Sequence, residues 1–267
     1  MKFFLAPMQG LTGYIVRNAF HHHFDYIDKY YTPFIPAAKR MNAKIKRDID
    51  PVNNDGITLI PQAMSIVADE VIDLHRQLAP YGYDEINVNL GCPSGTVVSK
   101  KRGSGILAYP DMLDSFLDEL YTKADFPVSI KTRVGFNDDE LWPKLIEIYS
   151  KYPISELTVH PRVQKDFYKN TPRMDDFALA VQKINPDKTT LCYNGDITDT
   201  NSFKALTDRF PDIDEIMIGR GLFANPALIA ELNGISMDRA ELCERLKNWH
   251  DEILSGYLSI FSGEKDA

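Results

Sequence analysis

Cysteine is scarce in this sequence, and its spacing does not suit a metal site. The three cysteines, Cys92, Cys192 and Cys243, are an odd number and form no C-x-x-C pair. Disulfide frameworks and structural zinc sites both need paired or clustered thiols. We therefore predict free thiols, no metal site and a reducing compartment, which we take to be the cytoplasm.

Long hydrophobic runs are missing as well. A membrane-spanning helix needs roughly 18 or more apolar residues in a row, and no stretch of the chain approaches that length. The apolar start at residues 3–6 is too short for a signal peptide, and Pro7 ends it. We expect a soluble protein that has no membrane partner.

Positive charge is in the minority. The chain has 30 Lys and Arg against 38 Asp and Glu, a formal net charge of −8. Because nucleic-acid binding usually needs a basic face, this balance argues mildly against general RNA or DNA binding. Two local clusters run against the balance, and each one alone is best interpreted as a solvated surface. They comprise Lys39, Arg40, Lys44, Lys46 and Arg47, and then Lys100, Lys101 and Arg102.

Apolar segments recur along the 267 residues, with helix-sized gaps between most of them. The expected strands cover residues 3–8, 26–35, 58–64, 85–90, 127–132, 156–160, 189–194 and 214–219. A first helical pattern ends near residue 23. Further helical patterns cover residues 68–79, 111–121, 141–149, 177–184 and 202–210. Strands that alternate with helices in this way predict an α/β protein, a (β/α)8 TIM barrel. We assign the barrel to residues 1–235.

The pattern changes after Pro226. Residues 237–261 predict one long helix with an apolar stripe. Such a helix must bury its stripe. It packs either on the barrel or on further helices of a larger C-terminal bundle.

The segment that organises the chain is residues 84–93. Its alternating apolar residues predict a strand, which Gly91 and Pro93 end abruptly. Cys92 therefore lies at the C-terminal end of a strand, where barrel enzymes place their catalytic groups. Taken alone, Cys92 is as well explained as a small buried hydrophobic residue.

Polar groups also follow nearly all of the remaining predicted strands. Because parallel strands end on the same rim of a barrel, these residues predict one active site. They are Gln9, Gln62, Asn89, Lys131, Arg133, His160, Arg162, Asn194, Gly195, Asp196, Gly219 and Arg220. No Walker-type loop, H-E-x-x-H motif or nucleophile elbow occurs in the sequence.

Three parts of this rim favour a bound cofactor. The Gly219-Arg220-Gly221 turn opens a short helix after the last strand, a common place for phosphate binding. Lys131 has three interpretations: a Schiff base, a donor to a cofactor ring, or a partner of Asp84 or Glu85. The neutral amides of Gln62 and Asn89 favour the ring. By contrast, residues 21–23, three successive histidines, are interpreted as surface.

With these motifs in place, the sequence resembles the tRNA-dihydrouridine synthases. The opening motif is Ala6-Pro7-Met8-Gln9-Gly10-Leu11-Thr12, and the cysteine motif is Asn89-Leu90-Gly91-Cys92-Pro93-Ser94 followed by Gly103-Ser104-Gly105-Ile106-Leu107. Later motifs are Lys131-Thr132-Arg133, His160-Pro161-Arg162, Asn194-Gly195-Asp196-Ile197 and Met217-Ile218-Gly219-Arg220-Gly221. The similarity covers about residues 5–228.

The resemblance implies a bacterial flavoprotein that reduces specific uridines of tRNA to 5,6-dihydrouridine. It implies FMN as cofactor, NADPH as reductant, hydride transfer to uracil C6 and Cys92 as the acid that protonates C5. Residues implied at the flavin are Pro7, Met8, Gln9, Gln62, Lys131 and His160. Its phosphate would be held by Asn194, Gly195, Asp196, Gly219 and Arg220. Asn89 and Arg133 would hold the flipped uridine.

The chain departs from the family in three places. Gly13 stands where the family usually has an acidic residue, and Pro161 stands where Gly is common. The resemblance makes residues 236–267 the start of a helical tRNA-binding domain, here incomplete. We expect a monomer. The competing functions are an FMN barrel that acts on a free pyrimidine or other small molecule, and an RNA-binding barrel without catalysis.

Overall fold

The computed structural model describes residues 1–37 and 40–263. Lys39, from the first basic cluster, and residues 264–267, at the end of the expected C-terminal segment, lie outside the described residues.

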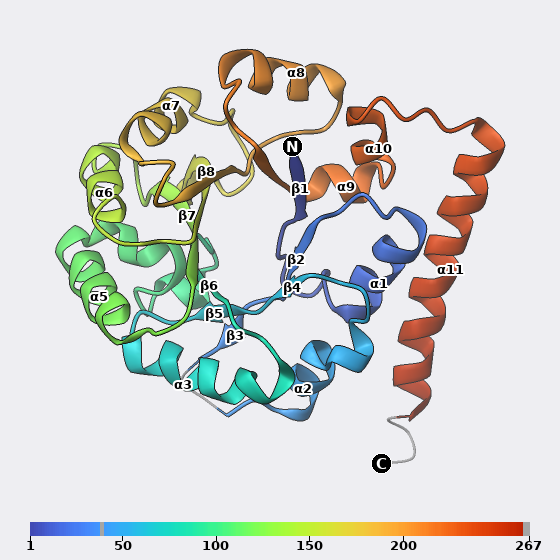
Figure 1. Cartoon of the computed structure of the whole chain (residues 1–267), viewed down its shortest axis with the longest axis horizontal. Coiled ribbons are helices and arrows are strands. Elements are labelled where there is room, and N and C mark those ends of the chain that lie inside the picture. The colour runs from blue at the N-terminus through green and yellow to red at the C-terminus, as the bar shows by residue number, and fades with distance from the viewer. Residues whose placement is uncertain (38–39, 264–267) are drawn as a thin grey trace.

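The sheet consists of parallel strands that close into a barrel (Figure 1). The strands are β1 (Lys2–Leu5), β2 (Lys29–Tyr31), β3 (Ile35–Pro36), β4 (Leu59–Ile60), β5 (Gln62–Met64), β6 (Ile86–Leu90), β7 (Val128–Gly135), β8 (Glu156–Val163), β9 (Thr190–Tyr193) and β10 (Glu215–Ile218). Their order is β3-β5-β6-β7-β8-β9-β10-β1-β2-β4.

Prolines explain why the structure has more strands than the sequence predicts. β4 and β5 flank Pro61, and Pro33 lies between β2 and β3. A proline has no N–H to donate, so each of these predicted strands appears as two short ones. β2 pairs with β4, and β3 pairs with β5. β2 and β3 together therefore form one strand of the barrel, and β4 and β5 together form the next, so the strand order closes on itself. The predicted (β/α)8 barrel is confirmed.

Helices surround the sheet (Figure 1). They are α1 (Tyr14–His23), α2 (Ala43–Ile49), α3 (Ala68–Leu78), α4 (Gly95–Val98), α5 (Pro110–Lys123), α6 (Trp142–Tyr149), α7 (Met174–Lys183), α8 (Thr200–Arg209), α9 (Arg220–Ala224), α10 (Leu228–Leu232) and α11 (Arg239–Gly263). Short 3-10 turns cover Pro51–Asn53, Ala79–Tyr81, Gly103–Ala108 and Gln164–Asp166. Every helix predicted from the sequence occurs, with shifted ends, and α2, α4 and α10 are additions.

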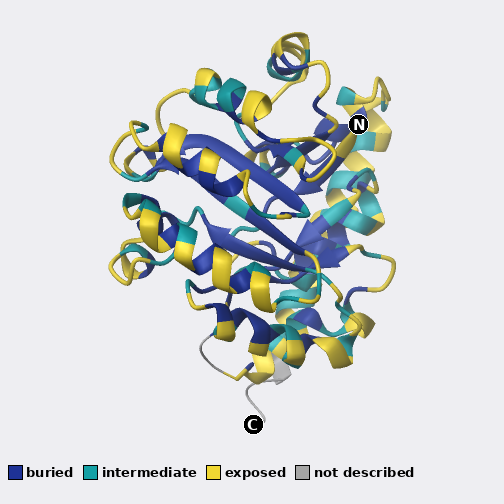
Figure 2. Cartoon of the chain, turned by 60° about the vertical axis from the view of Figure 1, so that its left-hand side comes forward, coloured by how far each residue is buried: buried dark blue, intermediate teal, exposed yellow. Residues whose placement is uncertain are grey.

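The core lies between the strands and the inner faces of the helices. Figure 2 shows the strands as buried and the outer faces of the helices as exposed. The apolar stripe of α5, formed by Leu113, Phe116, Leu117 and Leu120, is buried as its spacing predicts. β6 is buried along its whole length. Its asparagines therefore lie inside the protein, where their amides need partners.

The long C-terminal helix α11 packs against α1. Trp249 meets Phe20 edge to face, with ring centroids 5.3 Å apart. The carboxylate of Glu252 contacts His22 and His23 at 2.9 and 2.8 Å. Two of the three histidines interpreted as surface therefore serve the contact between α1 and α11. Within the part of the chain described, no helix combines the length and apolarity needed to cross a membrane.

Candidate active site

A cavity of about 530 Å³ opens at the carboxyl ends of the strands. Its lining includes all of the residues that we predicted for the site except Arg162, which is buried: Pro7, Met8, Gln9, Gln62, Asn89, Cys92, Lys131, Arg133, His160, Asn194, Gly195, Asp196, Gly219 and Arg220. These residues come from separate strand ends, and the barrel brings them together. The lining also includes residues that the sequence analysis did not single out, notably Phe34, Phe167 and Tyr168.

Cys92 is held by backbone contacts on both sides. Its N–H donates to Asn89 Oδ1 at 2.9 Å, and its carbonyl accepts the Oγ–H of Ser104 at 2.9 Å. Gly103 makes this approach possible, since it has φ +54° and a Cβ there would lie 2.7 Å from the Cys92 carbonyl oxygen. Burial raises the pKa of the Cys92 thiol, although a hydrogen bond from the Ser94 backbone and the charges of Arg133 and Lys131 oppose the shift. The side chain therefore stays protonated near neutral pH.

A chain of amides begins in the lining of the cavity and continues into the core. Asn89 Nδ2 donates to Gln62 Oε1 at 2.7 Å, and Gln62 Nε2 donates to Asn87 Oδ1 at 2.8 Å. Asn87 Nδ2 continues the chain to Ser129 Oγ at 3.0 Å. These contacts fix which end of each amide carries the oxygen. Both polar atoms of the Asn89 side chain are therefore in use: Nδ2 holds Gln62, and Oδ1 holds the Cys92 loop.

Lys131 points into the cavity from β7. Its Nζ donates to Asn194 Oδ1 at 2.6 Å, and Asn194 Nδ2 donates to the Met217 carbonyl at 2.8 Å. The alternative of a pair with Asp84 or Glu85 is wrong, because Lys131 lies against Asn194 instead. Burial, with a smaller contribution from Arg133, lowers the pKa of Lys131 to about 7. Its charge is therefore sensitive to any anion that enters the cavity.

His160 is neutral. Burial lowers the pKa of its imidazole well below the usual value, and the nearby Arg133, Lys131, Arg162 and Arg220 add to the shift. Arg162 Nη1 lies 3.2 Å from His160 Nε2. Because arginine can only donate, Nε2 accepts and the single ring proton sits on Nδ1.

The predicted phosphate ligand Asp196 is engaged by two arginines. It accepts from Arg162 at both carboxylate oxygens, with 2.9 Å from Nη1 to Oδ1, and from Arg220 Nη2 at 2.8 Å. A carboxylate repels a phosphate, so Asp196 is placed to orient Arg220 rather than to meet an anion itself. Arg162 is fully buried behind it.

Arg133 joins two loops of the rim. Its Nε, Nη1 and Nη2 donate to the carbonyls of Gly91, Val163 and Phe167 at 3.0, 2.9 and 2.6 Å. Burial and Arg162 lower its pKa to about 10, so it stays charged at neutral pH. Most of its hydrogen-bonding capacity therefore positions the Cys92 loop against the loop after β8.

The aromatic pair Phe167-Tyr168 is the main part of the site that sequence reasoning missed. The Tyr168 ring lies 4.9 Å from the guanidinium of Arg220 and 5.6 Å from that of Arg133. Phe167 has φ +51°, an unusual conformation for a bulky residue. The only sequence signal was an aromatic pair in the loop after a strand that ends in cationic groups.

Comparison with known proteins identifies the family. The family model "Dihydrouridine synthase (Dus)" matches residues 4–252. The chain belongs to the dihydrouridine synthase family. It is 27% identical over 278 residues to a "Probable tRNA-dihydrouridine synthase" of Staphylococcus aureus (strain MRSA252), covering 99% of this chain and 79% of the relative. It is 26% identical over 243 residues to "tRNA-dihydrouridine synthase B" of Pasteurella multocida (strain Pm70), covering 88% of this chain and 69% of the relative.

Solved structures show the same barrel architecture. Morphinone reductase aligns with a TM-score of 0.59 at 11% identity, over 90% of this chain and 88% of that one. The 3-hexulose-6-phosphate synthase from Salmonella typhimurium aligns with a TM-score of 0.54 at 15% identity, over 92% of this chain and all (100%) of that one. At such low identity, these similarities concern the fold alone. Among the described residues, His, Cys, Asp and Glu form no group of three or more that could hold a metal ion.

Proposed function

We propose that this dihydrouridine synthase family member reduces uridines of tRNA to 5,6-dihydrouridine, with FMN as cofactor and NADPH as the source of electrons. The observation that carries the proposal is the thiol of Cys92. It is held in its protonated form in the same cavity as Gln62, Lys131 and His160.

The residues of the cavity fit FMN. Small-molecule sites range over about 300–1,000 Å³, and this cavity falls within that range. Lys131 lies inside the cavity and Arg220 lies at its rim, so the two cations suit an electron-rich ring at one end and a phosphate at the other. Gly219 also lines the cavity, and a Cβ there would lie 3.3 Å from Ala6 Cβ, so a side chain at this position would crowd the cavity wall.

In this proposal the flavin ring would be held by Pro7, Met8, Gln9, Gln62, Lys131 and His160. Its phosphate would be held by Asn194, Gly195, Gly219 and Arg220, with Asp196 acting through Arg220. The bound flavin supplies the hydride that is added to C6 of the uracil ring. Lys131 donates from Nζ toward negative charge on the ring, and such a charge favours its protonated state.

Cys92 completes the reduction as a general acid. Its Sγ gives a proton to C5 of the uracil as C6 gains the hydride, and the thiolate recovers a proton from water. A thiol with a raised pKa is suited to proton donation, whereas a nucleophilic cysteine would need a lowered pKa. Asn89 and Arg133 act in the proposal mainly by holding the Cys92 loop, beside which the flipped base enters.

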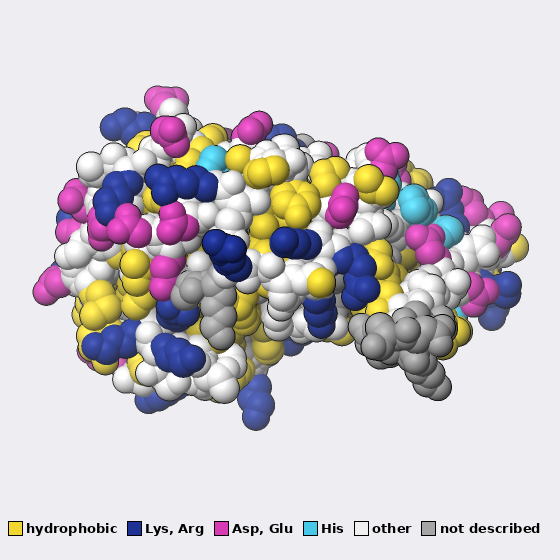
Figure 3. Space-filling view, turned by 90° about the horizontal axis from the view of Figure 1, so that it is seen from below, with side chains coloured by type: hydrophobic (Ala, Val, Ile, Leu, Met, Phe, Trp, Pro, Cys, Tyr) yellow, Lys and Arg dark blue, Asp and Glu magenta, His cyan; other side chains and the backbone are white. Residues whose placement is uncertain are grey.

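A cationic surface on α2 supports RNA as the partner. We call this surface the α2 cluster: Arg40, which precedes the helix, and Lys44, Lys46 and Arg47 on it, all exposed and without an ion pair among the described residues. Figure 3 shows Lys and Arg side chains over this face of the molecule. The helix that carries the cluster contacts the segment that lines the cavity: Asp48 of α2 accepts from the Tyr14 N–H at 2.7 Å, and Leu11, three residues earlier, lines the cavity. We assign tRNA contact to this surface and to the C-terminal segment from residue 236 onward, which contains α11.

The test is an anaerobic reoxidation experiment. The protein is reduced with NADPH, unmodified tRNA is added, and the flavin absorbance is followed. Rapid reoxidation by tRNA, with dihydrouridine in the product, supports the proposal. Reoxidation by free uridine but not by tRNA would instead establish a small-molecule reductase. A protein that binds tRNA but takes up no flavin would be an RNA-binding barrel without catalysis.

A further inference from the structure

The helix α1 begins without a capping side chain of its own. Its N-cap is Gly13, which has nothing to offer the free N–H groups of the first turn. The carboxylate of Asp48, from α2, caps the helix instead, because its Oδ1 accepts the Tyr14 N–H at 2.7 Å. A Cβ on Gly13 would lie 3.3 Å from the same oxygen, so the missing side chain is what lets Asp48 approach.

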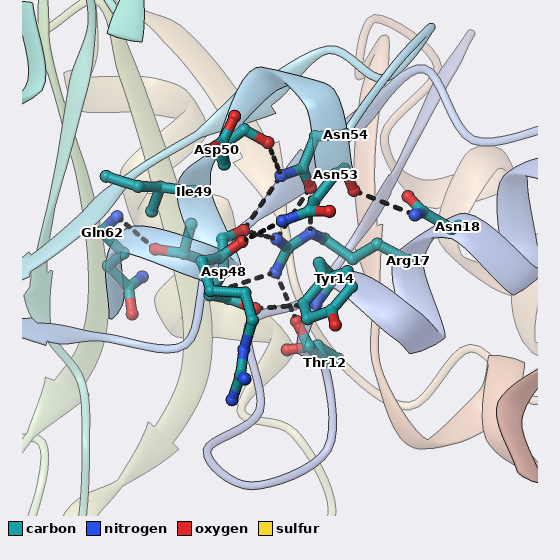
Figure 4. A network of polar contacts seen from close by, with 12 residues as sticks. Thr12, Tyr14, Arg17, Asn18, Asp48, Ile49, Asp50, Asn53, Asn54 and Gln62 are labelled. Atoms are coloured by element: carbon teal, nitrogen blue, oxygen red, sulfur yellow. Dashed lines mark hydrogen bonds and ion pairs between the residues drawn. The ribbon is translucent and has the colours of Figure 1, made fainter. Parts of the chain in front are cut away.

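Asp48 also belongs to a buried network around Arg17 (Figure 4). The Arg17 side chain has no exposed surface. Its Nη1 donates to the Thr12 carbonyl at 2.7 Å and to Asp48 Oδ2 at 3.3 Å, and its Nη2 donates to the Asp48 carbonyl at 2.6 Å. Asn54 Oδ1 accepts from Arg17 Nη2 at 2.8 Å. Asp48 supplies the carboxylate that this buried guanidinium contacts.

This network leads directly to the wall of the active site. Arg17 donates to the Thr12 carbonyl. The Thr12 hydroxyl accepts the Met8 N–H at 2.9 Å and donates to the Met8 carbonyl at 3.2 Å. These contacts close the loop from Met8 to Thr12. Met8, Gln9 and Leu11 of that loop line the cavity. The order of contacts is therefore Asp48 to Arg17 and Tyr14, then Thr12, then the cavity wall.

We propose that Asp48 is a positioning residue that fixes the Met8–Thr12 loop against the cofactor from outside the cavity. It does so by capping α1 in place of a side chain at Gly13 and by pairing with Arg17. The inference rests on the proposed function for the identity of the cofactor. The geometry of the loop itself does not depend on that identity.

The first test compares Asp48→Ala with a variant that is destabilised elsewhere, Ile146→Ala on the buried face of α6. Hydrogen exchange of residues 8–16 and the dissociation constant for FMN are measured for both. Because a misplaced positioning loop weakens the contacts it presents, we expect Asp48→Ala to raise the FMN dissociation constant about tenfold or more. We also expect faster exchange in residues 8–16. Ile146→Ala should change neither beyond its global loss of stability.

The second test moves the carboxylate. Gly13 has φ −69° and ψ 170°, a conformation open to any L-residue, and Asp is a favoured N-cap. The double variant Gly13→Asp/Asp48→Ala should therefore recover most of the FMN affinity and the slow exchange. Gly13→Asp alone should bring no gain, because the new side chain would crowd Asp48.

The outcomes separate this inference from the proposed function. Exchange and FMN affinity in Asp48→Ala that equal those of Ile146→Ala would overturn the positioning role, as would a double variant no better than Asp48→Ala. If Asp48→Ala does not fold, Asp48→Asn replaces it; this variant keeps the acceptor for Tyr14 and should show a smaller change in the same direction. A wild-type protein that binds no FMN would reject the proposed cofactor, while the exchange data would still decide the role of Asp48.

Discussion

At the scale of single residues, the environment of Cys92 decides what kind of chemistry it can perform. An ordinary cysteine thiol has a pKa of about 8.5 and is mostly protonated at pH 7. Burial raises the pKa of Cys92, and the neighbouring Arg133 and Lys131 do not overcome that effect. The Cys92 thiol at the cavity wall therefore stays protonated near neutral pH, which is the state that a general acid requires.

The direct consequence is that Cys92→Ala should separate binding from catalysis. The Cys92 backbone, not its thiol, bonds Asn89 and Ser104, so the loop and the flavin affinity should be unchanged. Loss of a general acid costs about 10²–10⁴-fold in rate. Single-turnover formation of dihydrouridine measures the loss. The matched control is Cys243→Ala on the exposed side of α11, and equal rates for the two variants would remove the acid role from Cys92.

Lys131 predicts a pH dependence of stability for the flavin-free protein. Its folded-state pKa is about 7, against about 10.4 in an unfolded chain. Between these values the unfolded state binds the proton and the folded state does not, so this residue makes stability rise with pH over that window. Urea unfolding at pH 7 and pH 9 should show a larger gain for the wild type than for Lys131→Met. Parallel changes in the two proteins would contradict the burial of the ammonium group.

Residue positions within the site could be predicted, but residue partners could not. Each strand end is visible in the sequence, and the barrel rule gathers the ends on one rim. Which groups then touch depends on the loops. Nothing in the sequence pairs Arg162 with Asp196, 34 positions away, or places Asp48 on the first turn of α1. For the same reason the sequence led us to expect Asn89 and Arg133 at the substrate. In the structure, most of their polar side-chain atoms form hydrogen bonds to the backbone of the rim loops.

At the scale of secondary structure, long periodic elements were predictable and short polar ones were not. The helix expected at 237–261 is α11, Arg239–Gly263, because its apolar stripe is long and regular. Helix α2 spans 7 residues, mostly charged, and only Ile49 is buried. It lacks the apolar period that marks a helix in sequence. Its position follows from tertiary contacts, above all those of Asp48.

The contact between α11 and α1 yields a prediction at this scale. Gly256 lies where a Cβ would come 2.7 Å from Ile15 Cγ2. Gly256→Val should therefore push the helices apart and destabilise the protein by about 1–3 kcal/mol, the usual cost of overpacking. Thermal unfolding measures the effect. Ser255→Val, at the exposed neighbouring position, is the control for helix propensity, and equal losses for the two variants would show that α11 does not pack here.

At the scale of the whole molecule, the net charge is a poor guide to the partner. The chain carries −8 overall, yet the α2 cluster gathers four cations without ion pairs among the described residues, next to the cavity. Acidic groups elsewhere, such as those on α5 and α7, take part in ion pairs with neighbouring helices. A local field of one sign can steer a polyanion to one face while the rest of the surface repels it.

This distribution predicts where charge reversal will weaken tRNA binding. Lys44→Glu/Lys46→Glu changes the α2 cluster beside the cavity, whereas Lys183→Glu/Lys188→Glu makes the same change in charge before β9, at the opposite rim of the barrel. Because each lost phosphate contact lowers the slope of log affinity against log salt by about 0.7–0.9, the first pair should weaken tRNA binding and flatten the salt dependence by roughly one to two units. The control pair should change both only slightly, and FMN affinity should be the same in all three proteins. Equal losses from the two pairs would mean that tRNA responds to the net charge of the protein and not to α2.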